Sequence, residues 1–255
     1  MLHDDHPLRI EAAGGSSRRL VVSFTSVGNK RDAWPPKEFV GMASQMGRNH
    51  VICVTDISRC WMNQSGMLRK ITTVISDYIL ENGITSINAV GTSMGAYNAL
   101  ILGQQMPISQ IIAFTPQYSV HPDVIPDETR WKWFRNQIEE WPHKELNRLP
   151  GAPASIYMFH GDTPDEKMHW QRFGEAKNLR HYIFSGANHN FLQELKDGGV
   201  LGKIVRAGIN ERPVRLGKVV KRAGGMRRSE FEAFDAAMAH FSERRKITRP
   251  DALRG

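Results

Sequence analysis

Ser93 lies at the centre of the pentapeptide Gly91-Thr92-Ser93-Met94-Gly95, with a glycine two residues to either side. A serine hydroxyl becomes a good nucleophile only when a base takes its proton, and it must stand clear of the backbone so that an acyl carbon can approach. A sharp turn between a strand and a helix meets the second need, and only small residues fit around such a turn. The pentapeptide therefore marks Ser93 as the candidate nucleophile of an acyl-transfer reaction.

The segments around this motif supply the strand and the helix that such a turn needs. Residues 84–90, which end in the mainly apolar Ile87-Asn88-Ala89-Val90, are a predicted strand, and residues 94–105 follow as a predicted helix. Similar runs predict further strands at 20–24, 50–56, 111–114, 154–159 and 181–184, and helices at 35–46 and 65–82. Such alternation predicts an α/β fold with a mostly parallel sheet, helices on both faces, and ligands bound beyond the carboxyl ends of the strands. Residues 8–12 are expected to add an antiparallel edge strand.

The pentapeptide and the strand-helix order of residues 18–200 resemble the nucleophile elbow and the core of the α/β-hydrolases. One position departs from the pattern, because Ala96 stands where many members have another glycine. The resemblance implies an α/β-hydrolase domain over residues 1–207. Residues 117–150, which follow the fourth core strand and are rich in aromatic residues, are expected to form a short helical, cap-like insertion.

The resemblance also implies a histidine after the last core strand, and His189 ends the loop at that place. His160 is the rival base, but it precedes the acid candidates and would invert the family's order of nucleophile, acid and histidine. Members often carry the acid a few residues after a Gly-Asp pair at a strand end, which favours Asp165. Asp162 and Glu166 are the alternatives, and Asp162 is also suited to bracing the turn through backbone amides.

Acyl transfer through a serine also needs two preset hydrogen-bond donors for the oxyanion. The backbone amide of Met94, directly after the nucleophile, is the first expected donor. The loop after the first core strand is expected to supply the second, with Ser26 favoured and Val27 as the alternative. The His-Gly pair that many family members carry there is replaced by Phe24-Thr25.

The loops after the other strands are expected to set specificity, because such loops surround the site in parallel sheets. Arg59 and Trp61 follow the second strand and Gln117 follows the fourth, so these three side chains are predicted to line the mouth of the pocket. Aromatic and polar groups together suit an acylated sugar or another small polar substrate. The tryptophans of the insertion are also suited to packing a cap helix onto the core.

No metal site and no cofactor are predicted. His160 and His169 flank Asp162 and Asp165, which invites a metal hypothesis, but the strand-turn context explains the aspartates better. Cys53 and Cys60 form neither a disulfide framework nor a metal-binding pattern. The first seven residues lack a signal peptide, and no apolar run reaches the roughly 20 residues of a membrane span. These features predict a cytoplasmic protein.

The net charge of +8 is concentrated near the end of the chain. Residues 1–202 contain 20 Lys+Arg and 20 Asp+Glu, whereas residues 203–255 contain 14 and 6. Residues 208–255 are predicted to form a basic linker, through residue 228, and a helix over 229–245. The basic segment suits an anionic partner, or it is an inert solvated arm. The helix has an apolar stripe that would dock on its own domain or on a second subunit in a homo-oligomer, formed by Phe231, Phe234, Met238 and Phe241.

The leading hypothesis is a serine esterase acting on a small-molecule acyl or ester substrate. Ser93 attacks, His189 moves the proton, Asp165 orients His189, and water hydrolyses the acyl-enzyme. Thioesterase, amidase and acyltransferase activities remain alternatives, because a triad specifies only attack on an acyl carbon. The alternative from a different class is a non-catalytic hydrolase-fold protein whose basic tail binds a polyanion or a protein complex.

Overall fold

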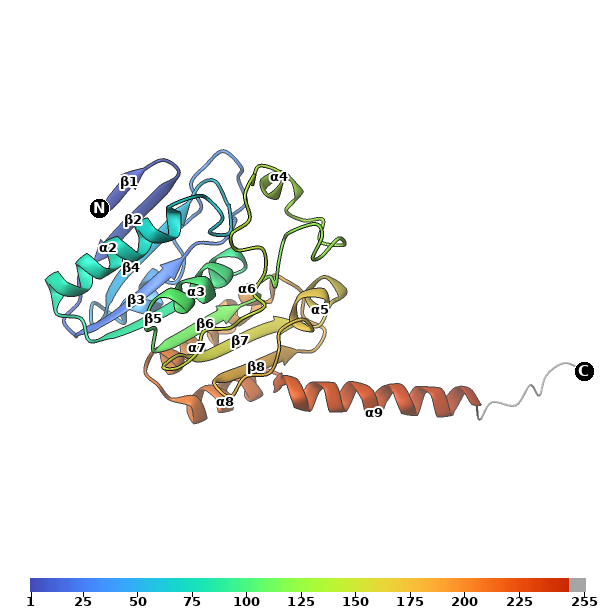
Figure 1. Ribbon diagram of the computed structural model, residues 1–255. Helices are drawn as coiled ribbons and strands as arrows, with labels where there is room; N and C mark the ends of the chain where they lie inside the picture. Colours follow the sequence, from blue (N-terminus) through green and yellow to red (C-terminus); the bar gives the residue numbers. More distant parts are fainter. Residues whose placement is uncertain (248–255) are drawn as a thin grey trace, which may run out of the picture.

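Figure 1 shows the computed structural model of the chain as a twisted sheet with helices against both faces and one long helix that leaves the body. The structure describes residues 1–247. Within them, a nine-stranded sheet has the order β1-β2-β4-β3-β5-β6-β7-β8-β9. The strands from β3 to β8 pair in parallel, and β1, β2 and β9 pair antiparallel at the two edges. The sheet is thus mostly parallel, as the sequence predicts.

The strands coincide with the apolar runs of the sequence. The parallel strands are β3 (Arg19–Phe24), β4 (His50–Asp56), β5 (Ser86–Thr92), β6 (Gln110–Phe114), β7 (Ser155–Gly161) and β8 (Leu179–Phe184). They are buried along nearly their whole length because helices cover both faces. The predicted edge strand is β2 (Leu8–Ala13), which pairs with β4, and β1 (His3–Asp5) extends it as a hairpin.

Two layers of helices enclose the sheet, each with its own apolar core. The core on one face includes α2 (Met67–Asn82) and α3 (Met94–Gln105). The core on the other face includes α1 (Val40–Ser44), α6 (Phe191–Asp197), α7 (Leu201–Ile209) and α8 (Pro213–Arg222). The helix predicted over residues 35–46 is shorter than expected, because Phe39 adopts a left-handed conformation with φ 61° and α1 begins only after it.

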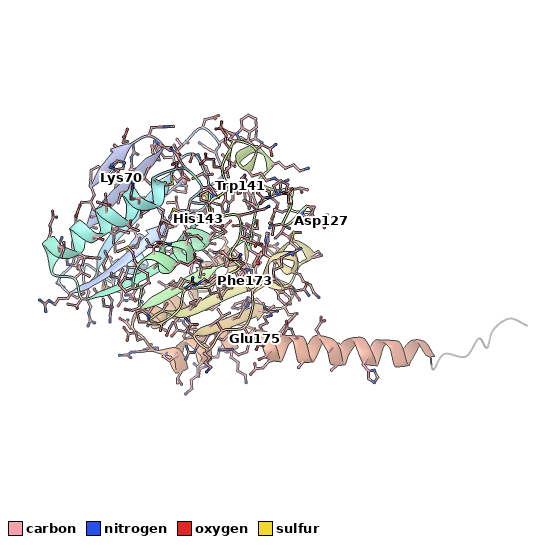
Figure 2. The ribbon with its side chains drawn as sticks, viewed as in Figure 1. Lys70, Asp127, Trp141, His143, Phe173 and Glu175 are labelled. Atoms are coloured by element: carbon pink, nitrogen blue, oxygen red, sulfur yellow. The ribbon has the colours of Figure 1, made fainter. Side chains whose placement is uncertain are left out.

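The insertion of residues 117–150 contains only one short helix, α4 (Lys132–Arg135), and Figure 1 shows it beyond the carboxyl ends of β6 and β7. The next helix, α5 (Pro164–Trp170), follows β7 at the same edge. Trp141 and His143 of the insertion are labelled in Figure 2. The hydroxyl of Tyr97 on α3 donates a hydrogen bond to the carbonyl of His143, which fastens the insertion to the core.

The linker predicted over residues 208–228 is instead folded onto the sheet. Leu216 and Val220 of α8 are fully buried, while the basic residues of this helix face outward. β9 (Gly225–Arg227) then pairs antiparallel with β8. The linker prediction missed a helical pattern, because Leu216, Val219 and Val220 recur at helical spacing after Pro213 in a segment otherwise dominated by basic residues.

The last helix, α9 (Arg228–Ile247), covers the predicted final helix and projects from the body in Figure 1. Phe231 packs against Trp170, whereas Phe234 and Met238 are half exposed to solvent. The side chain of Phe241, and residues 248–255 of the predicted tail, lie outside the described residues. Among the described helices, none combines the length and the apolar character that crossing a bilayer demands.

Candidate active site

The turn between β5 and α3 places Ser93 at the carboxyl edge of the sheet, in a strained backbone conformation with φ 54° and ψ −124°. The flanking glycines make this turn possible. A methyl group on Gly91 would overlap the backbone of Gly95, and one on Gly95 would overlap the carbonyl of Phe24. Packing therefore requires glycine at both positions. The absence of side chains there allows the start of α3 to lie against the loop that follows β3.

His189 lies beside Ser93, as the sequence predicts. Its Nε2 atom is 3.1 Å from the Oγ atom of Ser93. The loop that carries His189 is held against the end of β7, because Asp162 accepts hydrogen bonds from the amide of Gly186 at 2.6 Å and from the hydroxyl of Ser185 at 3.4 Å. Asp162 thus braces this turn and does not contact His189.

The carboxylate beside His189 belongs to Glu166, not to Asp165. The Nδ1 atom of His189 is 2.6 Å from the Oε1 atom of Glu166, whose side chain is 1% exposed. Asp165 has a side chain that is 40% exposed and forms an ion pair with Arg130 at 2.9 Å. The expectation that Asp165 orients His189 is therefore corrected by this geometry, which places the least favoured alternative at that position.

The start of α5 explains why neighbouring acids face different ways. Pro164 occupies the first turn of α5, so Asp165 and Glu166 are already helical. Successive residues of a helix project about 100° apart, so only one of the pair can face His189. Pro164 is the residue in the sequence from which a helix start could have been predicted here. That prediction would have placed Asp165 and Glu166 on different faces of the helix.

The environment of Glu166 favours its ionised form. Burial alone raises the pKa of Glu166, but the hydrogen bond and the charge of His189, with smaller contributions from His160 and Arg130, together lower that pKa below its usual value. A carboxylate in this state can stabilise a protonated imidazole. His160, the rival base, is buried against His181 and the carbonyl of Pro116, and burial lowers its pKa to about 4.

Gln117 contacts the nucleophile directly. Its Nε2 atom lies 2.7 Å from the Oγ atom of Ser93, and its Oε1 atom lies 3.3 Å from the Nε1 atom of Trp61. An indole N–H can only donate, so the amide oxygen of Gln117 faces Trp61 and its NH₂ group donates to Ser93. Since Ser93 Oγ accepts this bond, its own proton points to His189, which must then carry its proton on Nδ1 and donate it to Glu166.

The other two predicted pocket residues are buried within the fold. Trp61 is fully buried behind Gln117. Arg59 is also fully buried, and its guanidinium group donates to the main-chain carbonyls of the 27–33 loop and of Ile57. Arg59 therefore shapes the loop after β3 and does not line the mouth. Its position after a strand predicted an outward side chain, but five N–H donors matched by nearby carbonyls make burial favourable.

The two amides expected to bind an oxyanion differ in whether a protein group already accepts their hydrogen bond. Met94 begins α3, so its N–H has no acceptor within the helix. The amide of Ser26 donates to Oε2 of Glu38 at 2.8 Å, and the hydroxyl of Ser26 donates to Oε1 of the same carboxylate at 2.9 Å. Burial raises the pKa of Glu38, against the two hydrogen bonds from Ser26 that lower it. Nothing in the sequence linked Glu38 to Ser26, because they lie 12 residues apart in an irregular loop.

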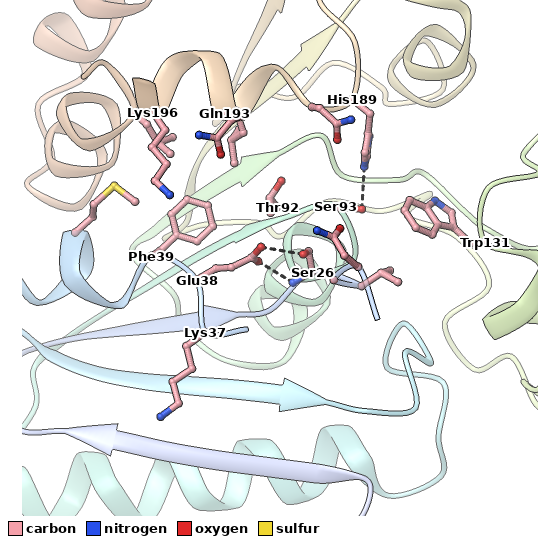
Figure 3. Close-up of a pocket in the computed structure, with 17 residues that line it drawn as sticks. Ser26, Lys37, Glu38, Phe39, Thr92, Ser93, Trp131, His189, Gln193 and Lys196 are labelled. Atoms are coloured by element: carbon pink, nitrogen blue, oxygen red, sulfur yellow. Dashed lines mark hydrogen bonds between the residues drawn. The ribbon is translucent and has the colours of Figure 1, made fainter. Parts of the chain in front are cut away.

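A cavity of about 610 Å³ opens at Ser93 and His189. Figure 3 shows its labelled walls, with Trp131 beside Ser93 at one end and Phe39, Gln193 and Lys196 toward the other. Trp131 comes from the insertion, and its ring centroid lies 6.0 Å from that of His189. The insertion thus forms one wall of the cavity. Across residues 1–247, no group of three or more His, Cys, Asp or Glu side chains is arranged so that it could hold a metal ion.

Comparisons with known proteins bear on the fold alone. No protein-family model and no curated protein matches the chain. Among solved structures, the chain is similar to the capsule O-acetyltransferase of Neisseria meningitidis serogroup A, with a TM-score of 0.55 and 15% identity over 80% of this chain and 93% of that one. A variant of that acetyltransferase in complex with CoA matches with a TM-score of 0.52 and 14% identity, over 77% and 91% of the two chains.

A further similar structure is MGS-MChE2, an α/β-hydrolase enzyme from the metagenome of lagoon sediments at Mar Chica, Morocco. It has a TM-score of 0.49 and 11% identity over 83% of this chain and 98% of that one. The strand order, the glycine-flanked serine between β5 and α3, and the likeness to the acetyltransferase structures agree with one another. The chain has the α/β-hydrolase fold.

Proposed function

We propose that this protein is a serine esterase, in which Ser93, His189 and Glu166 form the catalytic triad. The observation that carries the proposal is the continuous chain of contacts from Ser93 Oγ to His189 Nε2 at 3.1 Å and from His189 Nδ1 to Glu166 Oε1 at 2.6 Å. This chain ends at a cavity large enough for a small substrate. The geometry of the triad suits nucleophilic attack on an acyl carbon.

The reaction proceeds in two halves. Ser93 Oγ attacks the carbonyl carbon of the ester while His189 Nε2 takes the hydroxyl proton, and Glu166 stabilises the imidazolium. The oxyanion is received by the amide of Met94 and by a donor of the loop after β3. The intermediate expels the alcohol, which takes the proton from His189. Water then attacks the acyl-enzyme while His189 takes one of its protons. The second tetrahedral intermediate expels Ser93, which recovers that proton from His189, and the carboxylic acid is released.

The mixed lining of the cavity supports a polar ester as the substrate. Asn29, Thr92, Asn190 and Gln193 line it together with the apolar side chains of Phe39 and Leu192. An acylated sugar or a similar small polar ester fits this mixture. A second candidate, transfer of the acyl group to a hydroxyl, differs only in the acceptor of the second half. The fold shared with a capsule O-acetyltransferase favours including it in the experiment.

A fluorophosphonate probe tests the proposal without knowledge of the natural substrate. Labelling is expected on Ser93, identified by mass spectrometry, and is expected to be lost in Ser93→Ala but retained in Ser65→Ala, which removes an exposed hydroxyl outside the cavity. A folded wild-type protein that is not labelled at pH 7–8 would overturn the proposal. A panel of acetyl-sugar, short-chain ester and thioester substrates, each with and without an added polyol, then separates hydrolysis from transfer.

A further inference from the structure

The catalytic acid of the proposed triad is held by a residue of the insertion as well as by its own helix. Arg130 lies in the insertion, 36 residues before Glu166 in the sequence, and its Nη1 atom is 3.4 Å from the Oε1 atom of Glu166. That oxygen is the one that His189 contacts, whereas Oε2 of Glu166 is buried with no partner. Arg130 and His189 therefore share a single carboxylate oxygen.

Arg130 is itself fixed by several other contacts. Its Nη1 atom donates to the carboxylate of Asp165 at 2.9 Å, and its Nη2 atom donates to the carbonyl of Asp165 at 3.1 Å. Its Nε atom donates to Glu128 at 3.0 Å. The guanidinium thus ties the first turn of α5 to the insertion at several points, in a geometry that a planar fork of donors can satisfy and an ammonium group cannot.

Glu128 completes the cluster and balances its charge. Its side chain is 1% exposed, and its Oε2 atom lies 2.8 Å from Nε2 of His169. The amide of Tyr118 donates to Nδ1 of His169, so the neutral ring carries its proton on Nε2 and donates it to Glu128. Burial alone would raise the pKa of Glu128, but the bonds from His169 and Arg130 lower it to about 2.

We propose that Arg130 is a positioning residue of the triad, and that the segment from Glu128 to Trp131 belongs to the active site. Arg130 fixes the carboxylate of Glu166 against His189, Glu128 fixes and partly neutralises Arg130, and Trp131 forms the adjacent wall of the cavity. This inference rests on the proposed function, because it assigns Arg130 a role only through the triad. It also gives Asp165 a role, as a second anchor for Arg130.

The test is the pH profile of fluorophosphonate labelling of Ser93 in four proteins. They are the wild type, Arg130→Met, Arg130→Lys, and Lys132→Met as the control. Lys132 is exposed on α4 two residues away, so its loss removes a charge from the same insertion without touching Glu166. Arg130→Met is expected to lower the labelling rate at least tenfold, within the range seen for residues that act in one network. Arg130→Lys is expected to recover part of that rate, and Lys132→Met to match the wild type.

The charges around Glu166 and His189 predict the direction of the pH shift. Glu128, Asp165 and Glu166 face Arg130, and His160 and His169 are neutral and buried. Without Arg130, three carboxylates act on His189 with no nearby cation, which favours the protonated imidazole. The acid side of the Arg130→Met profile should therefore move to higher pH, by roughly half a unit to one unit.

The double variant Arg130→Met/Glu128→Gln separates positioning from charge balance. It restores the net charge of the cluster without restoring the contact to Glu166, so its pH profile should return toward that of the wild type while its rate stays about tenfold low. A double variant with the full wild-type rate would overturn the positioning role, as would an Arg130→Met protein that is labelled like Lys132→Met. Failure of the wild type to label would instead count against the proposed function.

Discussion

The Nε2 atom of Gln117 lies 2.7 Å from the Oγ atom of Ser93, so the nucleophile accepts a hydrogen bond from one side while it donates its proton to His189 on the other. Trp61 fixes the orientation of the Gln117 amide by donating to its oxygen. A residue expected to contact substrate therefore contacts the nucleophile, and it does so with a buried side chain that faces a buried indole.

Gln117→Leu removes this donor while nearly preserving the volume of the side chain. We expect kcat/KM to fall about tenfold, the equivalent of one neutral hydrogen bond. Trp61→Phe should lower it less, since the amide of Gln117 remains but loses its fixed orientation. Steady-state hydrolysis of a p-nitrophenyl ester measures both variants, with Trp133→Phe, an exposed tryptophan of the insertion, as the control. Equal rates in the wild type and in Gln117→Leu would show that the contact plays no part in the reaction.

Glu38 predicts a pH dependence of stability. Its pKa is raised above 4.5 in the folded protein, so at pH values between 4.5 and that raised pKa the folded state binds more protons than the unfolded state. The free energy of unfolding therefore falls as the pH rises from 4.5 through the pKa of the folded state. Glu38→Gln keeps an acceptor for the amide of Ser26 but cannot ionise. Its free energy of unfolding should therefore decline less than that of the wild type between pH 4.5 and pH 7.

Urea unfolding at a series of pH values measures this difference. The exposed Glu139 provides the control, because Glu139→Gln should run parallel to the wild type over the same interval. If the curves for Glu38→Gln and for the wild type were also parallel, the part-buried contact between Glu38 and Ser26 would have no influence on stability.

The elbow predicts a steric effect at Gly95. Gly95→Ala would drive a methyl group into the carbonyl of Phe24, and it should lower the free energy of unfolding by about 1–3 kcal/mol or more. Gly41, on α1, has open space around its Cβ position, so Gly41→Ala should be neutral or stabilising by up to about 1 kcal/mol. Chemical denaturation compares the two, and a Gly95→Ala protein as stable as Gly41→Ala would contradict the close approach of α3 to the loop after β3.

The basic residues on the outward face of α8 allow a direct test of the anionic partner that the sequence predicts. Removing residues after Gly208 would strip α8 and β9 from the sheet, whereas exposed charges can be replaced one by one. The triple variant Arg215→Ser, Lys218→Ser, Arg222→Ser should elute from heparin at lower salt than a control that loses three charges elsewhere, Arg48→Ser, Arg69→Ser, Lys70→Ser. Identical elution of the two variants would refute a specific role for this face.

The sequence was sufficient for the parts of the site that depend on local pattern. Ser93 and its flanking glycines lie at the end of one buried strand, and the loop that ends in His189 follows another, so periodicity and small-residue spacing predict their place. Other features depend on the directions of side chains that only packing decides. The choice of Glu166 over Asp165 follows from the register of one helix turn, and the buried state of Arg59 follows from carbonyls of a distant loop.

The side-chain positions in the insertion of residues 117–150 also depend on packing and could not be predicted from the sequence. Its tryptophans suggested either a pocket wall or a packed cap, and Trp131 lines the cavity while Trp133 is exposed to solvent. The contact between Arg130 and Glu166 joins two segments 36 residues apart, and no periodicity connects them. Long-range polar contacts of this kind depend on the final packing of irregular segments, which have no repeat for a sequence pattern to reveal.

The proposed triad is tested most directly by the rate of fluorophosphonate labelling of Ser93 in the matched variants Glu166→Gln and Asp165→Asn. Both replace a carboxylate by its amide on adjacent residues of α5, so they differ in the contact with His189. Glu166→Gln is expected to lose on the order of 10⁴ in rate, the scale of an amidated triad acid, whereas Asp165→Asn is expected to stay within about tenfold of the wild type. A large loss in Asp165→Asn together with a small loss in Glu166→Gln would contradict the proposed triad.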